Sequence, residues 1–203
     1  MKTLNQYINE KLKVSKTQYN YCPKTRKELD DLLYQLISER GWEANLNDID
    51  ISNITDMSGL FYYMKDFNSD ISGWDVSNVT NMEYMFNICH EFEGKGLENW
   101  NVSNVTNMRN MFGLCKKFEC KGLENWDVSN VTNMRLMFYG CHEFEGKGLE
   151  NWNVSNVTDM ESMFFSCKKF NTDISGWNVS NVKDYYHIFY KCPIKNKYKP
   201  KFR

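Results

Sequence analysis

The sequence has no long run of apolar residues. No stretch of its 203 residues approaches the ~20 consecutive apolar residues of a membrane-spanning helix, so we expect no membrane partner. Glu10 and Lys11 stand where a signal peptide has its apolar core, and no lipid-attachment cysteine follows such a core. We therefore expect a cytoplasmic protein. A surface or virion-associated location is the alternative if a leader precedes this sequence.

An excess of one charge sign is also absent. The 25 basic and 26 acidic residues give a net charge of −1, so bulk electrostatics does not attract nucleic acid, and we expect no nucleic-acid partner. Only the C-terminus is biased, because residues 193–203 and the preceding Lys191 form a basic tail. We expect this tail to be solvated, with a specific anionic partner as the alternative.

Residues that carry chemistry are scarce. Histidine occurs only at positions 90, 142 and 187, and no Ser/His/Asp grouping or phosphate-binding glycine loop stands out. His90 and His142 follow Cys89 and Cys141, which raises zinc as an alternative. However, these pairs lie two repeats apart, and adjacent residues cannot both face inward. We expect no enzyme, no cofactor and no metal site.

A 26-residue unit dominates the sequence. Five tryptophans mark it at spacings of 26, 26, 26 and 25, and a degenerate copy with Ile49 in the tryptophan position precedes them. These tryptophans are Trp74, Trp100, Trp126, Trp152 and Trp177. A fixed period in this range is typical of a solenoid, here six coils over residues 48–192.

Each coil is expected to be an α/β unit with one short strand and one short helix. Trp100 and Val102 alternate with a polar residue, which favours a strand. Apolar residues then follow at spacings of three or four, which predicts a helix with Thr106 as its N-cap. Two copies contain a complete capping box, Thr80 with Glu83 and Thr158 with Glu161.

Stacked coils would align equivalent residues in columns. The Trp, Val, Met, Phe and Leu columns are predicted to form the core. One cysteine per coil favours buried free thiols over disulfides, at Cys89, Cys115, Cys141, Cys167 and Cys192. A column of asparagines after serine is expected to point inward and to hydrogen-bond two coils; it comprises Asn53, Asn78, Asn104, Asn130, Asn156 and Asn181.

The first 47 residues are expected to form an α-helical cap over the first coil. Pro23 and Gly41 bracket a helix over residues 24–40, and a second helix is expected around Leu4, Tyr7, Ile8 and Leu12. Residues 18–21 between them would be a strand that starts the stack.

The repeated phrase W-D-V-S-N-V-T-N-M-x-x-M-F-x-x-C resembles the repeat of the BspA-like leucine-rich-repeat family, the DUF285 type. This family includes bacterial surface proteins, lipoproteins and phage proteins. The resemblance implies a leucine-rich-repeat-like, right-handed solenoid used for binding, and it carries over no catalytic residue.

The expected function is therefore a non-enzymatic protein-interaction module that binds another protein. The predicted contact surface is a polar stripe of outward strand positions, with Tyr139 and Phe165 as nearby aromatic anchors. This stripe comprises Asp75, Asn101, Asp127, Asn153 and Asn178. The alternative is a surface adhesin or carbohydrate-binding protein. The oligomeric state stays open.

Overall fold

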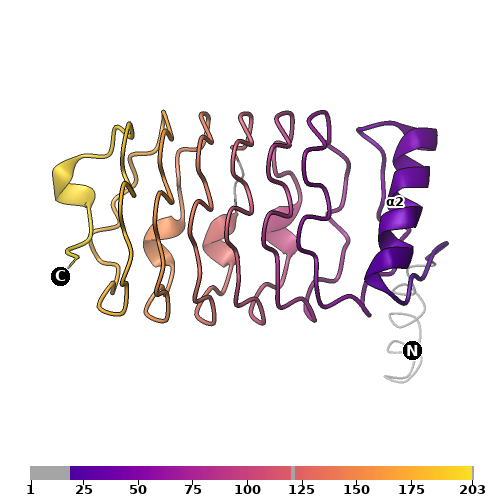
Figure 1. The fold of residues 1–203 in the computed structure, drawn as a ribbon, viewed down its shortest axis with the longest axis horizontal. Coiled ribbons are helices and arrows are strands. Elements are labelled where there is room, and N and C mark those ends of the chain that lie inside the picture. Colours follow the sequence, from indigo (N-terminus) through magenta and orange to yellow (C-terminus); the bar gives the residue numbers. More distant parts are fainter. Residues whose placement is uncertain (1–18, 120–121, 203) are drawn as a thin grey trace, which may run out of the picture.

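The repeats form a row of stacked coils in the computed structural model, which describes residues 19–119 and 122–202. The helix α2 (Arg26–Arg40) lies at one end of the row, and the 3-10 helix η4 (Asn196–Tyr198) lies at the other (Figure 1). Isolated parallel bridges join neighbouring coils in one register, through Asp56, Asn81, Asn107, Asn133, Asp159 and Asp184. The helix expected around Leu4 lies outside the described residues.

The short helix expected in each coil is wrong: the segment is a tandem of tight turns. The Met111 N–H donates to the Met108 carbonyl at 3.2 Å, and the Cys115 N–H donates to the Phe112 carbonyl at 2.9 Å. Leu114 has a left-handed backbone with φ of 62°, which an α-helix cannot contain. Four-residue turns return the chain to the same face, so their apolar spacing mimics that of a helix.

The N–H groups between these turn bonds join one coil to the next. The Asn110 N–H donates to the Arg135 carbonyl at 2.8 Å, and the Phe112 N–H donates to the Met137 carbonyl at 3.0 Å. We call this pattern the turn ladder: alternate N–H groups of residues 108–114 donate to alternate carbonyls of the following coil. The same holds at the equivalent positions of the other coils up to the one before the last. It satisfies the backbone without strands.

The prediction of a strand at Trp100 is also wrong, because the chain enters a tight turn directly after this residue. The Asn101 side-chain oxygen accepts from the Ser103 N–H at 3.2 Å, and the Val105 N–H donates to the Val102 carbonyl at 2.9 Å. A backbone hydrogen bond joins neighbouring coils one turn later, where the Thr106 N–H donates to the Thr80 carbonyl at 2.9 Å. The threonine hydroxyls follow the same path, as Thr106 Oγ1 donates to the Thr80 carbonyl at 3.2 Å, so they are not helix caps.

The core consists of the predicted columns. Phenylalanine rings stack from coil to coil, with ring centroids 5.6 Å apart for Phe86 and Phe112 and 5.7 Å apart for Phe112 and Phe138. A second phenylalanine column packs against the first, and Phe112 and Phe118 lie 4.1 Å apart. The Trp126 indole is buried and donates to the Leu97 carbonyl of the preceding coil at 2.8 Å. The tryptophan column therefore forms a packed wall.

The return segments are short and closely packed. The 3-10 helices η1 (Leu97–Asn99), η2 (Leu123–Asn125) and η3 (Leu149–Asn151) bury one leucine each. Each begins after a glycine in the left-handed region, such as Gly96 with φ of 89°. A Cβ atom on Gly96 would lie 2.3 Å from the Ser72 Cβ, so the neighbouring coil leaves no room for a side chain.

The predicted helix before the array is present as α2. Thr25 is its N-cap and accepts from the Glu28 N–H at 3.2 Å, and Gly41 ends it. Leu29, Leu33 and Leu36 on its buried face join the core of the coils. The expected strand of residues 18–21 is reduced, within the described part, to a single parallel bridge between Tyr21 and Ile49.

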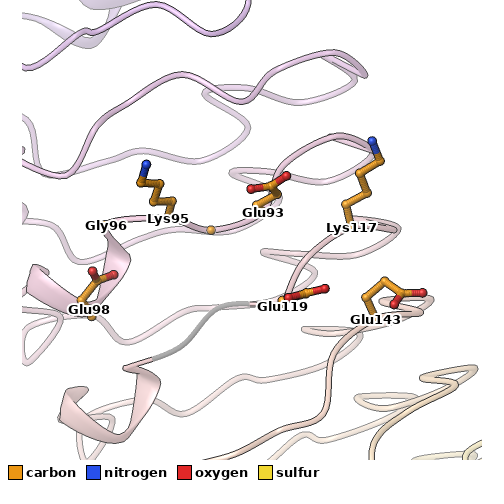
Figure 2. Close-up of a pocket in the computed structure, with 8 residues that line it drawn as sticks. Glu93, Lys95, Gly96, Glu98, Lys117, Glu119 and Glu143 are labelled. Atoms are coloured by element: carbon orange, nitrogen blue, oxygen red, sulfur yellow. The ribbon is translucent and has the colours of Figure 1, made fainter.

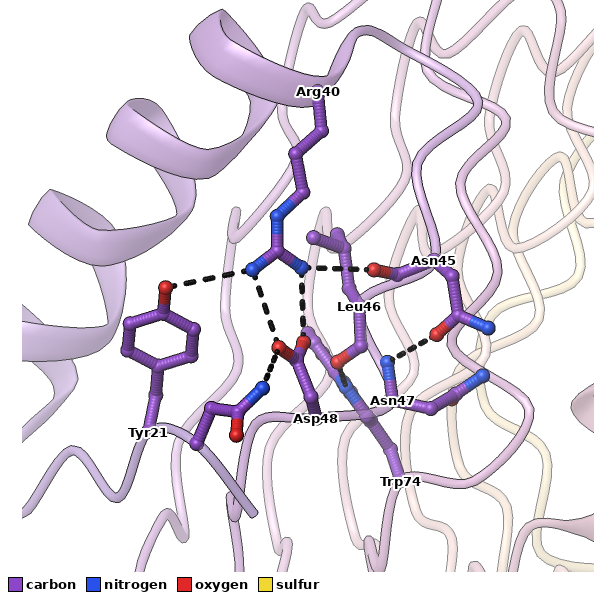
Figure 3. Close-up of polar contacts among 8 residues, drawn as sticks. Tyr21, Arg40, Asn45, Leu46, Asn47, Asp48 and Trp74 are labelled. Carbon is purple, nitrogen blue, oxygen red and sulfur yellow. Dashed lines mark hydrogen bonds and ion pairs between the residues drawn. The ribbon is translucent and has the colours of Figure 1, made fainter.

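An ion pair ties α2 to the first coil. The Arg40 guanidinium contacts both carboxylate oxygens of Asp48, at 3.0 and 3.2 Å (Figure 3). It also donates to the Asn45 carbonyl at 3.1 Å and to the Tyr21 hydroxyl at 3.4 Å. The hydrogen bonds from Arg40 lower the pKa of the Asp48 carboxyl.

The asparagine column points outward, so its predicted burial is wrong. Asn130 is exposed, because it follows Ser129 in the turn that the Val131 N–H closes on the Val128 carbonyl at 3.0 Å. Its predicted link between coils is present, as Nδ2 donates to the Ser103 carbonyl at 2.8 Å. Both valines are buried, and a tight turn between two buried residues pushes its corner into solvent.

The C-terminal segment packs on the last coil, which corrects the expected solvated tail. Ile194 is buried, and the Ile174 N–H donates to the Tyr198 carbonyl at 3.0 Å. The Phe202 ring stacks on Tyr185 with centroids 4.4 Å apart.

Candidate functional site

The polar stripe occupies one register in successive coils, and all five of its residues are exposed. Each side-chain oxygen accepts from the N–H two residues later, at 3.0 Å for Asp127 and 3.2 Å for Asn153. The hydrogen bonds from Ser129 also lower the pKa of the Asp127 carboxyl. The stripe therefore shapes turns and presents a polar surface, with one oxygen of each side chain already engaged.

The column cysteines are buried free thiols, as predicted, at Cys89, Cys115, Cys141 and Cys167. The Cys115 thiol donates to the Phe86 carbonyl of the preceding coil at 2.9 Å, and Cys141 contacts the Phe112 carbonyl in the same way at 3.0 Å. Burial raises the pKa of the Cys115 thiol well above its usual range, so it stays protonated and unreactive. Cys192 is half-buried, Cys22 is exposed, and Cys120 lies outside the described residues.

Charged columns line an open groove of about 470 Å³ along the return side (Figure 2). Lys117 pairs with Glu91, and Lys169 pairs with Glu143, so the alternating charges neutralise one another between coils. The groove is lined by Glu93, Gly94, Lys95, Gly96, Glu98, Lys117, Glu119 and Glu143. No histidine, cysteine or hydroxyl residue is among these lining residues, so they contain no Ser–His or Cys–His pair.

Aromatic side chains gather on the turn side of the last coils. The Phe165 ring lies between Tyr139 and Tyr190, with ring centroids 5.1 and 5.0 Å away. His187 joins them 4.9 Å from Tyr190, and Tyr186 lies 3.8 Å from His187. We call these five residues the aromatic ladder. Tyr186 is 65% exposed and Tyr190 is 47% exposed, so the ladder is open to solvent.

A second aromatic group lies on the same register in the first coils. Tyr62 and Tyr63 are more than half exposed, and Tyr84 contacts Tyr62 edge-on with centroids 6.2 Å apart. The row is interrupted between the two groups by Asn87 and Gly113. The Asn87 amide donates to the Gly113 carbonyl at 2.9 Å, which leaves a polar gap between two aromatic ends.

Sequence reasoning found only Tyr139 and Phe165 of the ladder. The missing signal lies in the variable positions of the repeated phrase, written x in M-x-x-M-F-x-x-C. These positions follow the Met and the Met-Phe pair. Tyr186, His187 and Tyr190 all occupy such positions in the last copy. Tyr19 and Tyr21 of the cap are half-buried.

None of the groups of histidine, cysteine, aspartate and glutamate in residues 19–119 and 122–202 could hold a metal ion. No helix in this part of the chain is long and apolar enough to cross a membrane.

The family comparison agrees with the repeat. A family model described as "Mycoplasma protein of unknown function, DUF285" matches residues 31–121 and 114–201. The chain belongs to the DUF285 family. The two matched segments span both the array and most of α2, so the DUF285 pattern covers nearly all of the described fold.

The DUF285 description assigns no function, and so no residue role comes from it. No curated protein and no solved structure matches the chain significantly.

Proposed function

We propose that this DUF285 protein is a non-enzymatic protein-interaction module whose contact surface includes the aromatic ladder. The observation that carries the proposal is the continuous contact of Tyr139, Phe165 and Tyr190 on adjacent coils. Each of these rings already contacts its neighbour in the row, so part of its side-chain freedom is lost before binding. Tyrosine is also enriched among the residues that dominate protein interfaces.

The polar stripe fits a different part of such an interface. Its side chains are exposed and hydrogen-bonded to their own turns, as at Asp127. Residues of this kind suit a polar rim, which contributes little binding energy. We therefore propose the ladder as the energetic centre and keep the stripe, Asp75 to Asn178, as a secondary contact.

Carbohydrate binding is the second candidate, and ring orientation argues against it. Phe165 is inclined by only 33° to both Tyr139 and Tyr190, so neighbouring ring faces are turned toward one another. A sugar ring stacks on an exposed aromatic face, and the part of each face that lies against a neighbouring ring is not available to it. An adhesin role therefore has less support than protein binding.

We further propose that the row of coils is a right-handed, leucine-rich-repeat-like solenoid of the BspA-like type, acting in the cytoplasm. The parallel register and the buried leucine of each return segment support the solenoid. A tandem of turns takes the place of the helix and the strand.

Two triple variants test the proposed surface. In the first, Tyr139, Phe165 and Tyr190 are replaced by serine; in the second, Asn101, Asp127 and Asn153 are replaced by lysine. Affinity capture from the native host should recover a protein partner with wild type, lose it with the first variant and only weaken it with the second. Loss with the stripe variant alone would move the site to the stripe, and retention by both would overturn both surfaces.

A further inference from the structure

The last coil ends the turn ladder. In the preceding coil, the N–H groups of Ser162, Phe164 and Ser166 donate to the last coil's carbonyls at 2.9, 3.0 and 2.8 Å. The acceptors are the alternate residues Tyr186, Ile188 and Tyr190. This register therefore selects carbonyls from every second residue of one chain.

The last-coil donors equivalent to those of Ser162, Phe164 and Ser166 have no such acceptor among the described residues. These are the N–H groups of His187, Phe189 and Lys191, and they make no hydrogen bond within the described part of the chain. His187 and Lys191 are exposed, and Phe189 is half-buried. We call these three N–H groups the open edge. An unpaired donor row of this kind accepts an added segment of polypeptide.

As far as the structure describes it, the C-terminal segment packs beside the open edge without hydrogen-bonding to it. It reaches Ile174 through the Tyr198 carbonyl, and the Lys195 N–H donates to Asn171 Oδ1 at 3.0 Å. Its last described contact is the Phe202 ring on Tyr185. In Figure 1 the segment closes the end of the row around η4, and among the described residues no hydrogen bond joins it to the open edge.

The surroundings of the open edge are basic. Residues 181–202 contain six lysines and one acidic residue, Asp184; the lysines are Lys183, Lys191, Lys195, Lys197, Lys199 and Lys201. The Lys191 ammonium lies 5.5 Å from the Tyr190 ring centre, and the Lys199 ammonium lies 5.7 Å from that of Phe189. Positive charge therefore borders the open donors directly.

We propose that the open edge binds an acidic peptide segment of another protein. Carbonyls of alternate peptide residues accept from His187, Phe189 and Lys191, and the peptide's carboxylates lie against Lys191 and Lys199. This surface lies at the end of the stack and is distinct from the lateral contact proposed above, although Tyr190 borders both.

Two features favour this occupant over the alternatives. The preceding coil already shows that peptide carbonyls fit the donor register, whereas nucleic acid offers no such row of carbonyls. A second copy cannot continue the stack head to tail, because α2 covers the opposite end. There the Arg26 guanidinium donates to the Ser58 carbonyl of the first coil at 3.1 Å.

Amide hydrogen exchange by NMR tests the edge directly on the full chain. The probe is a blocked hexapeptide of alternating Glu and Val; a Lys/Val hexapeptide and a single-stranded oligothymidine are the comparisons. With the Glu/Val peptide we expect exchange at His187, Phe189 and Lys191 to slow by at least about tenfold, as for newly hydrogen-bonded amides. Neither comparison should protect these amides.

Charge reversal supplies the second readout. The double variant Lys191→Glu and Lys199→Glu should weaken Glu/Val peptide binding by at least about tenfold, the scale of two lost ion pairs. The matched control is Lys116→Glu with Lys168→Glu, at exposed lysines of the inner coils, and should bind as wild type does. The serine triple variant of the aromatic ladder keeps the edge amides, so retained protection there separates this site from the lateral one.

Each other outcome overturns the proposal. Peptide binding without protection of the three amides would assign the contact to side chains alone. Equal binding of the Lys/Val peptide would remove the charge argument. Protection by oligothymidine in place of the peptide would make this end a nucleic-acid surface.

Discussion

At the scale of single residues, the fold depends on backbone conformations that side chains normally avoid. Tyr84 and Ile88 have φ of 56° and 67°, and Asn110 and Leu114 repeat this pattern one coil later. A left-handed non-glycine residue costs roughly 1–2 kcal/mol. Here the same residues donate to the next coil, as Ile88 does to the Gly113 carbonyl at 2.8 Å, and this contact offsets the cost.

The return-segment glycines should tolerate no side chain. Gly96→Ala adds a Cβ atom 2.3 Å from Ser72 Cβ and 2.9 Å from its Cα in a left-handed backbone. Conformational strain and overpacking together should lower the free energy of unfolding by about 2–4 kcal/mol. Gly176→Ala is the matched control, because a Cβ atom added there would meet no other atom within 4 Å. Equal midpoints of urea denaturation for the two variants would contradict the close contact between Gly96 and Ser72 of the neighbouring coil.

The buried thiols should make stability depend on alkaline pH. Burial raises the pKa of the thiols of Cys89, Cys115, Cys141 and Cys167 in the folded state. An acid with a raised folded pKa contributes fully below its unfolded pKa, about 8.5, and loses that contribution as the pH rises above it. The free energy of unfolding should therefore fall by up to about 1.4 kcal/mol per pH unit for each thiol.

Cys115→Ala checks this dependence. Between about pH 9 and 10, the free energy of unfolding of this variant should fall less steeply with pH than that of wild type. The two slopes should differ by at most the contribution of one thiol, about 1.4 kcal/mol per pH unit. Parallel pH profiles of the two proteins would mean that the Cys115 thiol already ionises in the folded state.

At the scale of elements, periodicity predicts which residues form the core but not the conformation of their backbone. The Met, Phe and Cys columns are buried as predicted, because spacing alone decides which residues share a face. The same spacing fits a helix and a tandem of four-residue turns. The difference lies in where alternate N–H groups donate, which depends on the neighbouring coil and so on tertiary contacts.

The asparagine column was misplaced for a related reason. A Ser-Asn pair between two buried valines occupies a turn corner, and the amide reaches the preceding coil from outside. Asn130→Ala should therefore lower the free energy of unfolding by only about 0.5–1.5 kcal/mol, as for an ordinary hydrogen bond. Asn130→Asp replaces the donor with a second acceptor opposite the Ser103 carbonyl and should cost more. Chemical denaturation tests both variants. An unchanged denaturation midpoint in both would show that the hydrogen bond from Asn130 to the Ser103 carbonyl does not stabilise the fold.

The junction between α2 and the first coil should weaken in acid. Arg40 lowers the pKa of Asp48, so the stabilisation is present above the unfolded pKa of about 3.9 and is lost as the pH falls through the folded value. Asp48→Asn should reduce the free energy of unfolding by about 1–3 kcal/mol at neutral pH. The difference from wild type should shrink as the pH falls below about 4.

The pair of Lys27 and Asp31 on the outer face of α2 provides the control. Both side chains are largely exposed, so Asp31→Asn should leave stability unchanged at either pH. A constant deficit of Asp48→Asn across the whole pH range would show that the residue acts by packing and not by charge.

At the scale of the whole molecule, the repeat predicts the core but not the binding surface. Recurring residues indicate the core, and the sequence therefore predicted the columns, the free thiols and the helix before the array. Binding surfaces lie at the positions where the repeat varies, and variation has no pattern in a single sequence. Only the stacking of coils brings Tyr139, Phe165 and Tyr190 into one ladder.

The central claim is that a protein partner contacts the aromatic ladder. Photo-crosslinking tests it most directly, with p-benzoylphenylalanine placed at Phe165 in one variant and at Asp127 of the polar stripe in the other. We predict that irradiation in the native host joins a single protein partner to the Phe165 variant in high yield, and to the Asp127 variant weakly or not at all. A crosslink formed only from Asp127, or none from Phe165 while the partner is still captured, would contradict it.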